Sequence, residues 1–570
     1  MVAVVPPALA GPVVLTATAS AAYLALAAVG LNLSVGLAGM PSLGHGAFVG
    51  LGAFGAAWAR TRLGFDPVAA ALAGAVLAAA AGAVTGAGLA KLRPVMLAVS
   101  TWILAWLVVT VLAAFPGLSG GARGIPLPEG VLVLEGIDRL IRFTPGVHHG
   151  VAVVLLGAAL LAYRRTDLGP AGIHLAAARG APAAADALGL PAERLRGGTF
   201  VASAAVAGVA GGFSVQLHGV ADASAYGPLL SVELLLAVLI GGAGATLGPV
   251  VGTLALVTLP SAARLVAGLL GADASGFEAV ITAVLLLGIL AAGGRGLLPP
   301  RRGSAARVEP ADPPPPPTAT LEAHDLARSF GGVRALEGVS LRVATGEVHA
   351  VIGPNGSGKT TLLRILAGAD RPDAGEVRLD GRGLSQAGVV PRLRAGVART
   401  LQRTMPFGAL RTEEHVAAGA AIHRRTGPLR WLLATPAARR EDRAVGAHAR
   451  GVLRSLGLEW LEGRGVRSLD GAERRLMSLA TAVGAAPSIL LVDEPSAGMA
   501  PREAQVVAEM LRRLRDRGLG LLVVEHNVSL VHEVADRVTV LEAGRVIATG
   551  TPAEVVRDPR VQEAYLGRTG

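Results

Sequence analysis

The sequence predicts a polytopic α-helical membrane domain followed by an α/β P-loop nucleotide-binding domain. The 570 residues are 52% hydrophobic with a mean hydropathy of +0.54, and the long apolar runs lie almost entirely within residues 1–298. Most of the charge lies in residues 321–570, which also contain a glycine-rich loop. Because the chain is too long for one core, we expect a membrane domain at 1–298, a linker at 299–320 and a soluble domain at 321–570.

Composition excludes several classes of function. The chain has no cysteine, which rules out disulfides and thiolate metal sites. The net charge is +11, but the arginines flank apolar runs or spread over the soluble half without a basic run interleaved with aromatics. Positive-inside loops explain this excess, so we expect no nucleic-acid binding. Residues 1–7 lack a basic stretch, which argues against a cleavable signal peptide.

Segments of about 20 apolar residues, the length that crosses a bilayer, recur through the first half. They lie near 13–37, 67–90, 95–115, 199–218, 229–258 and 277–294, with shorter candidates at 45–59, 149–163 and 250–268. Together they predict about eight or nine crossings. They lack the polar stripe of a soluble helix, and their repeated Gly and Ala favour close helix packing in lipid.

The arginine-rich stretches set the expected orientation. Residues 163–198 and the exit near 295–302 should be cytoplasmic, and the loop 116–149 external, while Arg60 and Arg62 leave the side of the N-terminus open. Residues 183–191 are typical of a short helix ended by glycine and proline. This helix would dock on a motor, or else be a solvated connector. Its candidate coupling residues are Ala183, Ala184, Ala185, Asp186, Ala187, Leu188 and Gly189.

The linker contains five consecutive prolines, Pro313 to Pro317. Such a run favours polyproline II, which we expect to form a semi-rigid spacer that belongs to neither neighbour. The linker is then only a tether, and the domain boundary falls within it.

The first motif of the soluble half is an expected strand, followed by a glycine-rich loop and a helix. The apolar run 347–352 leads into a GxxxxGK[ST] pattern and then into the helical run 362–366. In this context the loop's N–H groups cradle phosphate, Lys359 balances its charge, and the Thr360 hydroxyl can bind Mg²⁺. The nucleotide-binding candidates are Gly353, Pro354, Asn355, Gly356, Ser357, Gly358, Lys359, Thr360 and Thr361.

Two further apolar runs end in polar side chains. Residues 488–495 end in Asp493 and Glu494, and residues 521–526 end in His526. Asp493 at the end of a buried strand can hold the metal through water, and Glu494 can polarise the attacking water. Three strands that are each followed by residues suited to binding or hydrolysing a phosphate indicate a parallel α/β nucleotide-binding domain.

This half resembles the ATPase of ABC transporters, more narrowly the ATPase that pairs with branched-chain amino acid permeases, from about Leu321 to the end of the chain. The resemblance implies ATP and Mg²⁺ as ligands, Glu494 as catalytic base and His526 as the contact to the γ-phosphate. It also implies that Phe330 stacks on adenine and that Gln402 contacts the metal and faces the coupling helix. The metal set is thus Thr360, Gln402 and Asp493.

The first half is similar to the branched-chain amino acid permeases over nearly all of 14–298. The motifs that carry this resemblance are Ser42-Leu-Gly-His45-Gly-Ala-Phe48, Ser119-Gly-Gly-Ala-Arg-Gly124 and Gly241-Gly-Ala-Gly-Ala-Thr-Leu-Gly248-Pro249. His45 and Glu233 are ionisable groups beside apolar sequence, for which a functional and a helix-capping role stay equally open. The two resemblances imply ATP-driven import of branched-chain or related small amino acids. The alternatives are an importer of urea, short amides or other amino acids, an ABC exporter, and a non-transport ABC ATPase, which the membrane half argues against.

The signature segment departs from the ABC pattern. Where the family has Leu-Ser-Gly-Gly-Gln, this chain has Ser468, Leu469, Asp470, Gly471 and Ala472. In ABC motors that segment completes the partner subunit's ATP site, so the departure implies unequal sites and a second, different ATPase and permease. The resemblance also implies an extracytoplasmic substrate-binding protein. It places the chain as a multi-pass protein among the lipids of the cytoplasmic membrane, with its ATPase facing the cytoplasm.

Overall fold

The computed structural model describes residues 11–89, 92, 94–134, 139–270, 309–400, 407–424 and 435–566, with isolated positions between 280 and 299 and at 426, 427 and 430. It divides the chain into two compact units. Unit 1 contains residues 1–168 and 193–303, and unit 2 contains residues 169–192 and 304–570. A short segment from the first half of the sequence therefore belongs to the same unit as the second half.

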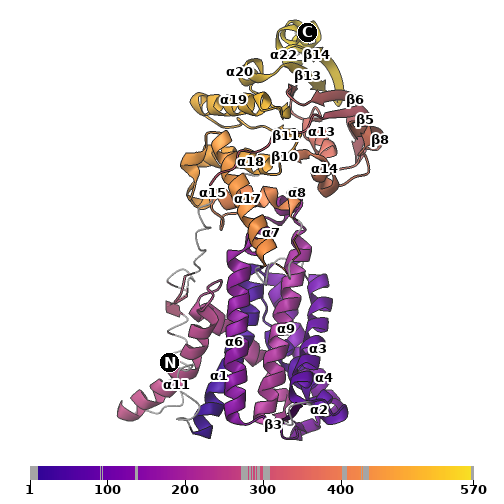
Figure 1. Ribbon diagram of the computed structural model, residues 1–570. Coiled ribbons are helices and arrows are strands. Elements are labelled where there is room, and N and C mark those ends of the chain that lie inside the picture. The colour runs from indigo at the N-terminus through magenta and orange to yellow at the C-terminus, as the bar shows by residue number, and fades with distance from the viewer. Residues whose placement is uncertain are drawn as a thin grey trace. The chain divides into compact units, whose positions relative to one another are not determined.

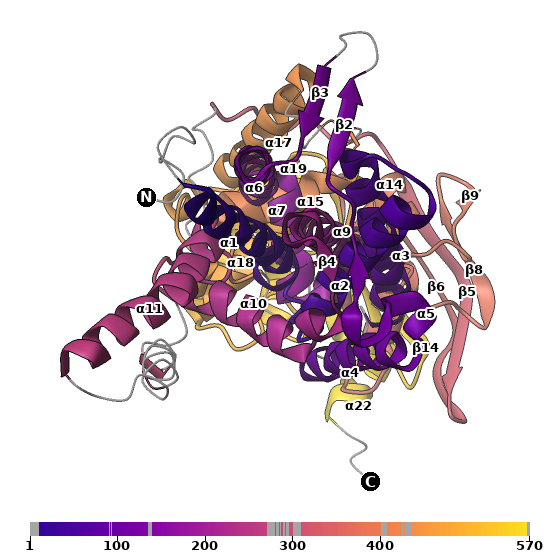
Figure 2. The same cartoon turned by 90° about the horizontal axis from the view of Figure 1, so that it is seen from below.

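Unit 1 is built of helices. They are α1 Pro12–Asn32, continued by the π-helical turn Leu33–Leu37, then α2 His45–Arg62, α3 Pro67–Leu89, α4 Pro94–Ala114, α5 Pro116–Ser119, α6 Pro145–Leu168, α9 Ala192–His218, α10 Pro228–Gly241 and α11 Gly248–Leu270. Short strand pairs join β1 Ile125–Pro126 to β4 Val220–Ala221 and β2 Val131–Leu134 to β3 Arg139–Arg142. Helix α1 packs against α6, and α11 contacts α10 and α1, while the C-terminal end of α11 extends away from the other helices in both views (Figures 1 and 2).

Five helices of the described residues are long and apolar enough to cross a membrane, namely Pro12–Leu37, Pro67–Gly88, Pro94–Ala114, Pro145–Leu168 and Ala192–His218. The single span expected at 229–258 is wrong. Helix α10 ends at Gly241 and α11 begins at Gly248, because Gly242 (φ 113°) and Gly244 (φ 86°) adopt left-handed conformations that interrupt the helix. The segment expected at 277–294 lies largely outside the described residues.

A buried asparagine holds this interruption in place. Asn32, at the end of α1, donates from Nδ2 to the Ala245 carbonyl oxygen (3.0 Å) and accepts at Oδ1 from the Gly244 N–H (2.9 Å). The side chain is fully buried, so it satisfies two backbone groups that helix geometry leaves without partners. Asn32 thus fixes the α10–α11 turn against α1.

Close helix packing in unit 1 depends on small residues, as the sequence predicts. A Cβ on Gly52 of α2 would collide with the backbone of Gly208 in α9, and one on Gly74 of α3 would collide with the Gly52 carbonyl. Backbones in direct contact leave no room for a methyl group, so these glycines allow α2, α3 and α9 to pack together.

Unit 2 contains a six-stranded sheet in the order β10-β11-β12-β7-β13-β14, in which only β14 runs antiparallel to its neighbour. Its strands are β7 Val348–Ile352, β10 Val397–Arg399, β11 Ile489–Asp493, β12 Gly520–Val524, β13 Arg537–Glu542 and β14 Arg545–Gly550. A second, antiparallel sheet has the order β6-β5-β8-β9, from β5 Thr320–Phe330, β6 Val333–Ala344, β8 Ala374–Leu379 and β9 Arg382–Gly383. The predicted α/β class is confirmed.

The helices of this part of the chain are α13 Lys359–Leu366, α14 Val389–Ala395, α15 Thr412–Gly419, α17 Pro436–Ser455, α18 Gly471–Gly484, α19 Pro501–Asp516, α20 Val528–Val534, α21 Pro552–Arg557 and α22 Pro559–Leu566. Helices α15 and α17 pack against each other and against α18. Successive residues of β11 and β12 join two different hydrophobic clusters, one with α18 and α19 and the other with α13 and the antiparallel sheet. Both strands are buried on both faces, which explains their continuous apolar sequence.

Residues 309–319 of the expected spacer contact unit 2. The Ala311 N–H donates to the Ala447 carbonyl oxygen (3.0 Å), and Arg517 donates from a terminal guanidinium nitrogen to the Pro313 carbonyl oxygen (3.2 Å). Polyproline II has no internal hydrogen bonds, so its carbonyl groups are available to neighbours. The expectation of a spacer that belongs to neither neighbour is therefore wrong for residues 309–319, because these residues bond to a surface of unit 2 that is distant in the sequence.

Candidate ATP site and coupling helices

Three parallel strands bring the predicted site residues to one edge of the sheet. Strand β12 lies between β11 and β7, with Asp493 opposite Val524 and Val524 opposite Val351. The carboxyl ends of the three strands therefore adjoin, and ligands of open parallel sheets bind at that edge. The phosphate loop follows β7, Asp493 and Glu494 end β11, and His526 follows β12.

The phosphate loop needs glycine at two positions. Gly353 (φ 150°) and Gly358 (φ 100°) have backbone conformations that side chains rarely adopt, and a Cβ would strike the carbonyl oxygens of Leu541 and Ala335, respectively. Gly358 is also the N-cap of α13, whose first residue is Lys359. The loop thus presents backbone N–H groups and a helix N-terminus together, which is the arrangement that binds phosphate.

Lys359 is held inside the loop. Its Nζ donates to the carbonyl oxygens of Gly353 and Pro354, each at 2.8 Å, and the residue is 8% exposed. Burial lowers the pKa of the ammonium group, while Glu494 and Asp493 oppose that change. The two carboxylates therefore favour the charged form of the lysine, which the loop carbonyl groups hold in place.

The two acids of β11 differ in environment. The Asp493 carboxylate pairs with Arg399 (2.8 Å) and its side chain is 3% exposed, whereas Glu494 is exposed. Glu494 has φ 44°, a left-handed conformation that is costly outside glycine, and its N–H donates to the Val524 carbonyl oxygen (2.9 Å). The turn directs the chain out of the strand directly after Asp493.

Glu525 is a central residue that the motif analysis missed. This fully buried carboxylate accepts at Oε1 from the Ser496 N–H and hydroxyl, and at Oε2 from the backbone N–H groups of His526 (2.7 Å) and Asn527 (3.1 Å). It therefore joins the segment after Glu494 to the segment that carries His526. The signal in the sequence is an acid at the end of the apolar strand 521–524, because a buried charge requires several hydrogen bonds.

The remaining predicted ATP-site residues are less constrained. The His526 side chain is 59% exposed, with Nδ1 3.5 Å from Glu525 Oε2. Phe330 ends β5, is 46% exposed and lies under the Arg328 guanidinium, 4.7 Å from the ring centroid. Thr360 and Thr361 are in the first turn of α13. Gln402 lies outside the described residues.

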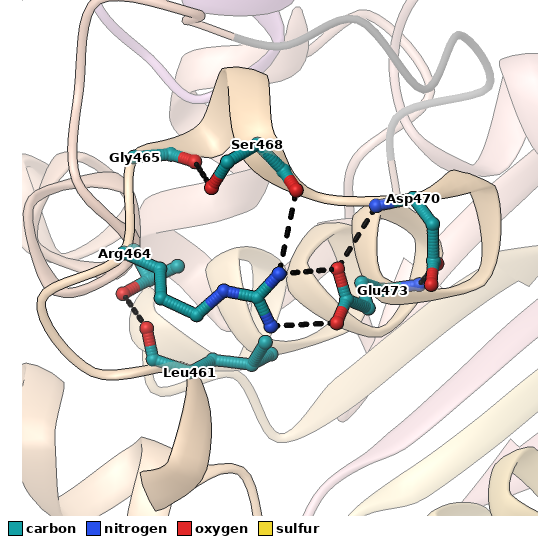
Figure 3. A network of polar contacts seen from close by, with 7 residues as sticks. Leu461, Arg464, Gly465, Ser468, Asp470 and Glu473 are labelled. Carbon is teal, nitrogen blue, oxygen red and sulfur yellow. Dashed lines mark hydrogen bonds and ion pairs between the residues drawn. The ribbon is translucent and has the colours of Figure 1, made fainter.

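The signature segment forms a closed polar network (Figure 3). Asp470 is the N-cap of α18 and accepts from the Glu473 N–H (2.8 Å), while the Glu473 carboxylate accepts from the Asp470 N–H (2.9 Å). Arg464 binds both oxygens of Glu473, at 2.6 and 3.0 Å. The Ser468 hydroxyl donates to the Gly465 carbonyl oxygen (2.8 Å), before the helix begins. Leu469 is buried and Gly471 opens the helix.

The predicted coupling segment packs against the nucleotide-binding half. Helices α7 Pro170–Gly180 and α8 Pro182–Ala187 belong to unit 2, where α7 contacts α15 and α8 contacts α14 (Figure 1). Gly189, with φ 78°, ends the segment, and a Cβ there would lie 2.7 Å from Ile422 Cδ1 and 3.4 Å from Leu393 Cδ2. Asp186 Oδ1 accepts from the Ala192 N–H at the start of α9 (3.0 Å). Of the two interpretations, docking on a motor fits these contacts.

Helix α7 brings a half-buried histidine to the same contact. Burial, and to a smaller extent the neighbouring Arg424, together lower the pKa of His174 to about 3. Arg424 in turn pairs with Asp442 of α17 (3.4 Å). His174 therefore stays neutral at physiological pH and contributes a packed ring rather than a charge.

The two ionisable residues in the membrane half have different surroundings. His45 is fully buried at the start of α2, and its Nε2 lies 3.2 Å from the Ser203 hydroxyl, which donates to the Gly30 carbonyl oxygen. Glu233 is exposed on α10. His45 thus connects three helices, and Glu233 has no comparable contact among the hydrogen bonds of the described residues.

Comparisons with known proteins match successive parts of the chain. Residues 13–290 match the branched-chain amino acid transport system permease component, residues 336–497 match the ABC transporter family, and residues 545–569 match the branched-chain amino acid ATP-binding cassette transporter family. The high-affinity branched-chain amino acid transport ATP-binding protein BraF of Pseudomonas aeruginosa is 34% identical over 248 residues, which cover 43% of this chain and 97% of BraF.

Two further relatives match the second half. The lipopolysaccharide export system ATP-binding protein LptB of Escherichia coli is 34% identical over 249 residues, 44% of this chain and 98% of LptB. A crystal structure of a nucleotide-free ATP-binding cassette from an ABC transporter is 29% identical, covers 44% of this chain and 100% of its own, and has a TM-score of 0.39.

The Glu525 network predicts a specific kinetic defect. Glu525→Gln replaces one carboxylate oxygen with an amide nitrogen, which cannot accept the hydrogen bonds made there. A buried donor without its acceptor costs about 1–3 kcal/mol, so we expect ATP turnover (kcat) to fall by about tenfold or more while the Kd for ATP changes little. Glu509→Gln, at an exposed surface acid of α19, serves as the control. Wild-type kcat in Glu525→Gln would show that the network does not position His526.

Proposed function

Because this chain belongs to the branched-chain amino acid transporters of the ABC class, we propose that it is the fused permease and ATPase of an importer for branched-chain or related small amino acids. The observation that carries the proposal is the order of three family matches on one polypeptide: permease, ATP-binding cassette and the C-terminal segment of the branched-chain group. ATP hydrolysis in unit 2 drives transport through the helices of unit 1.

The cassette alone does not determine the direction of transport. Its sequence is equally similar to BraF and to LptB, a component of an export system. The permease and C-terminal matches favour import of amino acids, because neither is a feature of the generic cassette. Urea, short amides and other amino acids remain alternative cargoes. Uptake measured over a panel of these compounds, with the candidate receptor present, decides among them.

The residues of unit 2 support a role for each part of the ATP site. The phosphate loop binds the phosphates through its N–H groups, and Lys359 neutralises their charge. Mg²⁺ in nucleotide sites takes one or two protein oxygen ligands together with phosphates and water. Thr360 at the start of α13 and Asp493 at the end of β11 fit that donor set. When bound, the ion would supply positive charge at the phosphates.

Three side chains outside the phosphate loop complete the proposed ATP site. Glu494 is exposed at the strand end and can take a proton from the attacking water. His526, whose backbone N–H donates to the Glu525 carboxylate, would contact the terminal phosphate. Phe330 offers an exposed ring for adenine. These roles form one proposal, in which hydrolysis requires Lys359 and Glu494.

We place the membrane half in the cytoplasmic membrane with the cassette on the cytoplasmic side. The five membrane-capable helices support the membrane location, and the arginine-rich segment that contains α7 and α8 supports the side. A second permease, a second ATPase and an extracytoplasmic receptor are the proposed partners, since an ABC importer is built from two membrane and two ATPase domains.

The start of α18 supports a revised register for the signature segment. Leu469 is buried and Asp470 is the N-cap, a position that serine and aspartate both favour. We therefore align Leu469-Asp470-Gly471-Ala472-Glu473 with Leu-Ser-Gly-Gly-Gln, one residue later than the Ser468–Ala472 alignment. In this register a carboxylate replaces the serine hydroxyl, and Glu473, already paired with Arg464, replaces the glutamine. The partner's ATP would then face a negative charge, which makes the two sites unequal.

The ATP-site assignment predicts two distinct defects in the complex reconstituted with its partners. Lys359→Ala should abolish ATP binding and uptake, because no other described side chain donates a positive charge inside the loop. Glu494→Gln should bind ATP but not turn it over, because the amide cannot accept the proton from water. Glu542→Gln, at an exposed acid that ends β13, should behave as wild type. Near-normal turnover in Glu494→Gln would remove Glu494 from the base role.

The signature assignment predicts a gain of activity. Asp470→Ser keeps an N-cap acceptor but removes the charge, so ATP turnover in the complex with a partner ATPase should rise by about tenfold or more, the equivalent of one charge-assisted hydrogen bond. Ser468→Ala removes only the bond to the Gly465 carbonyl oxygen and should leave turnover unchanged. The opposite pattern, with loss of turnover in Ser468→Ala and no effect of Asp470→Ser, would support the earlier alignment and refute the revised one.

A further inference from the structure

The proline-rich segment packs on unit 2 with a regular period. Along residues 309–319, Pro310, Pro313 and Pro316 are half-buried and Ala319 is buried, while the positions between them are exposed. A period of three matches polyproline II, which has three residues per turn and therefore presents every third residue on one face. The segment, which we name the strap, thus has a binding face and a solvent face.

The strap crosses from one part of the cassette to another. At its start, the Ala311 N–H donates to the Ala447 carbonyl oxygen of α17 (3.0 Å). In its middle, the Pro313 carbonyl oxygen accepts from Arg517, at the C-terminus of α19 (3.2 Å). At its end, Ala319 exchanges hydrogen bonds with Thr345, just after β6: the Ala319 N–H donates to the Thr345 hydroxyl (3.3 Å), and the Thr345 N–H donates to the Ala319 carbonyl oxygen (3.0 Å).

The cassette surface under the strap is shaped to receive it. Gly451 of α17 lies so close to the Ala311 carbonyl oxygen that a Cβ would collide with it, and the Cβ position of Gly518 lies 3.7 Å from Pro316 Cγ. The prolines close a cavity of about 80 Å³ with side chains from α17, α18 and α19 and the residues next to them. The other lining residues are Ser455, Val483, Ala486, Pro487, Leu514, Arg517 and Leu519.

We propose that the strap is a brace, in which a polyproline II segment occupies a matching groove and fixes α17 relative to α19 and the parallel sheet. Helix α17 packs against α18, which begins at the signature segment, whereas the phosphate loop follows β7 of the sheet. The brace therefore restricts movement of the signature segment relative to Lys359. A polyproline II segment suits this role because it loses little conformational entropy on binding.

The absence of cysteine allows a direct test in the full-length chain. Cysteines introduced at the exposed residues Arg443 of α17 and Gln505 of α19 take spin labels, and pulsed electron paramagnetic resonance gives their distance distribution. One variant replaces Pro313–Pro317 with Gly-Ser-Gly-Ser-Gly, which leaves every cassette residue unchanged. A second variant, Gly451→Ala, displaces the strap from the other side. Gly446→Ala is the matched control, because a Cβ there meets nothing within 4 Å in the same helix.

We expect one narrow distance distribution for the parent and for Gly446→Ala. Both strap variants should give a broader distribution and a melting temperature lower by about 2–4 °C. A distance distribution like the parent's in the Gly-Ser variant would overturn the proposal that the strap is a brace. That conclusion holds even if the melting temperature falls, because a fall alone would mean that the strap stabilises the fold without controlling the position of α17. Neither readout requires transport or ATP turnover, so failure of the brace is distinct from failure of the proposed function.

Discussion

The contact of Gly189 with Leu393 and Ile422 is the constraint on which the rest of the structure depends. It is where a segment of the permease sequence becomes part of the cassette unit. A left-handed glycine ends α8 with its backbone close to two aliphatic side chains, and Asp186 then caps the next long helix. The same short stretch of chain thus contacts the cassette and begins α9. We propose that this stretch transmits the effect of ATP hydrolysis to the membrane helices, because its Gly189 contacts the cassette and its Asp186 caps α9.

The cassette fold follows closely from its sequence. Residues 489–492 and 521–524 are apolar at every position because both faces of the strands are buried, and each run is followed directly by an acid, Asp493 or Glu525. That acid lies at the edge where open parallel sheets bind ligands. The glycines of the phosphate loop are required by their φ angles. Glu525 was missed because motif analysis looks for side chains that reach the ligand, whereas this carboxylate bonds only to backbone and hydroxyl groups beneath the site. Long-range pairs such as Arg464 with Glu473 also depend on tertiary packing.

The membrane half is less predictable, since hydropathy does not show where an apolar run is interrupted. Gly242 and Gly244 lie within one hydrophobic segment, and only the hydrogen bonds of Gly244 and Ala245 to Asn32, more than 200 residues earlier in the sequence, show what holds the interruption in place. The strap presents the same limitation. Every third residue of the strap is more buried than its neighbours, but the sequence does not show this period, because Pro310 and Ala319 are identified as part of it only by their burial in the structure. In both cases the partner surface is distant in sequence, so local pattern alone cannot indicate it.

The most direct test of this account is cargo-dependent ATP turnover and uptake in Gly189→Val, because the claim is that docking of α8 couples the two halves. Gly219→Val carries similar backbone strain (φ 75° against 78°) with nothing within 4 Å of its Cβ, and is the matched control. The account predicts that Gly189→Val loses uptake and cargo-stimulated turnover while it retains ATP binding, and that Ile422→Ala, by making space, partly restores both. Wild-type coupling in Gly189→Val, or equal loss in Gly219→Val, would contradict it.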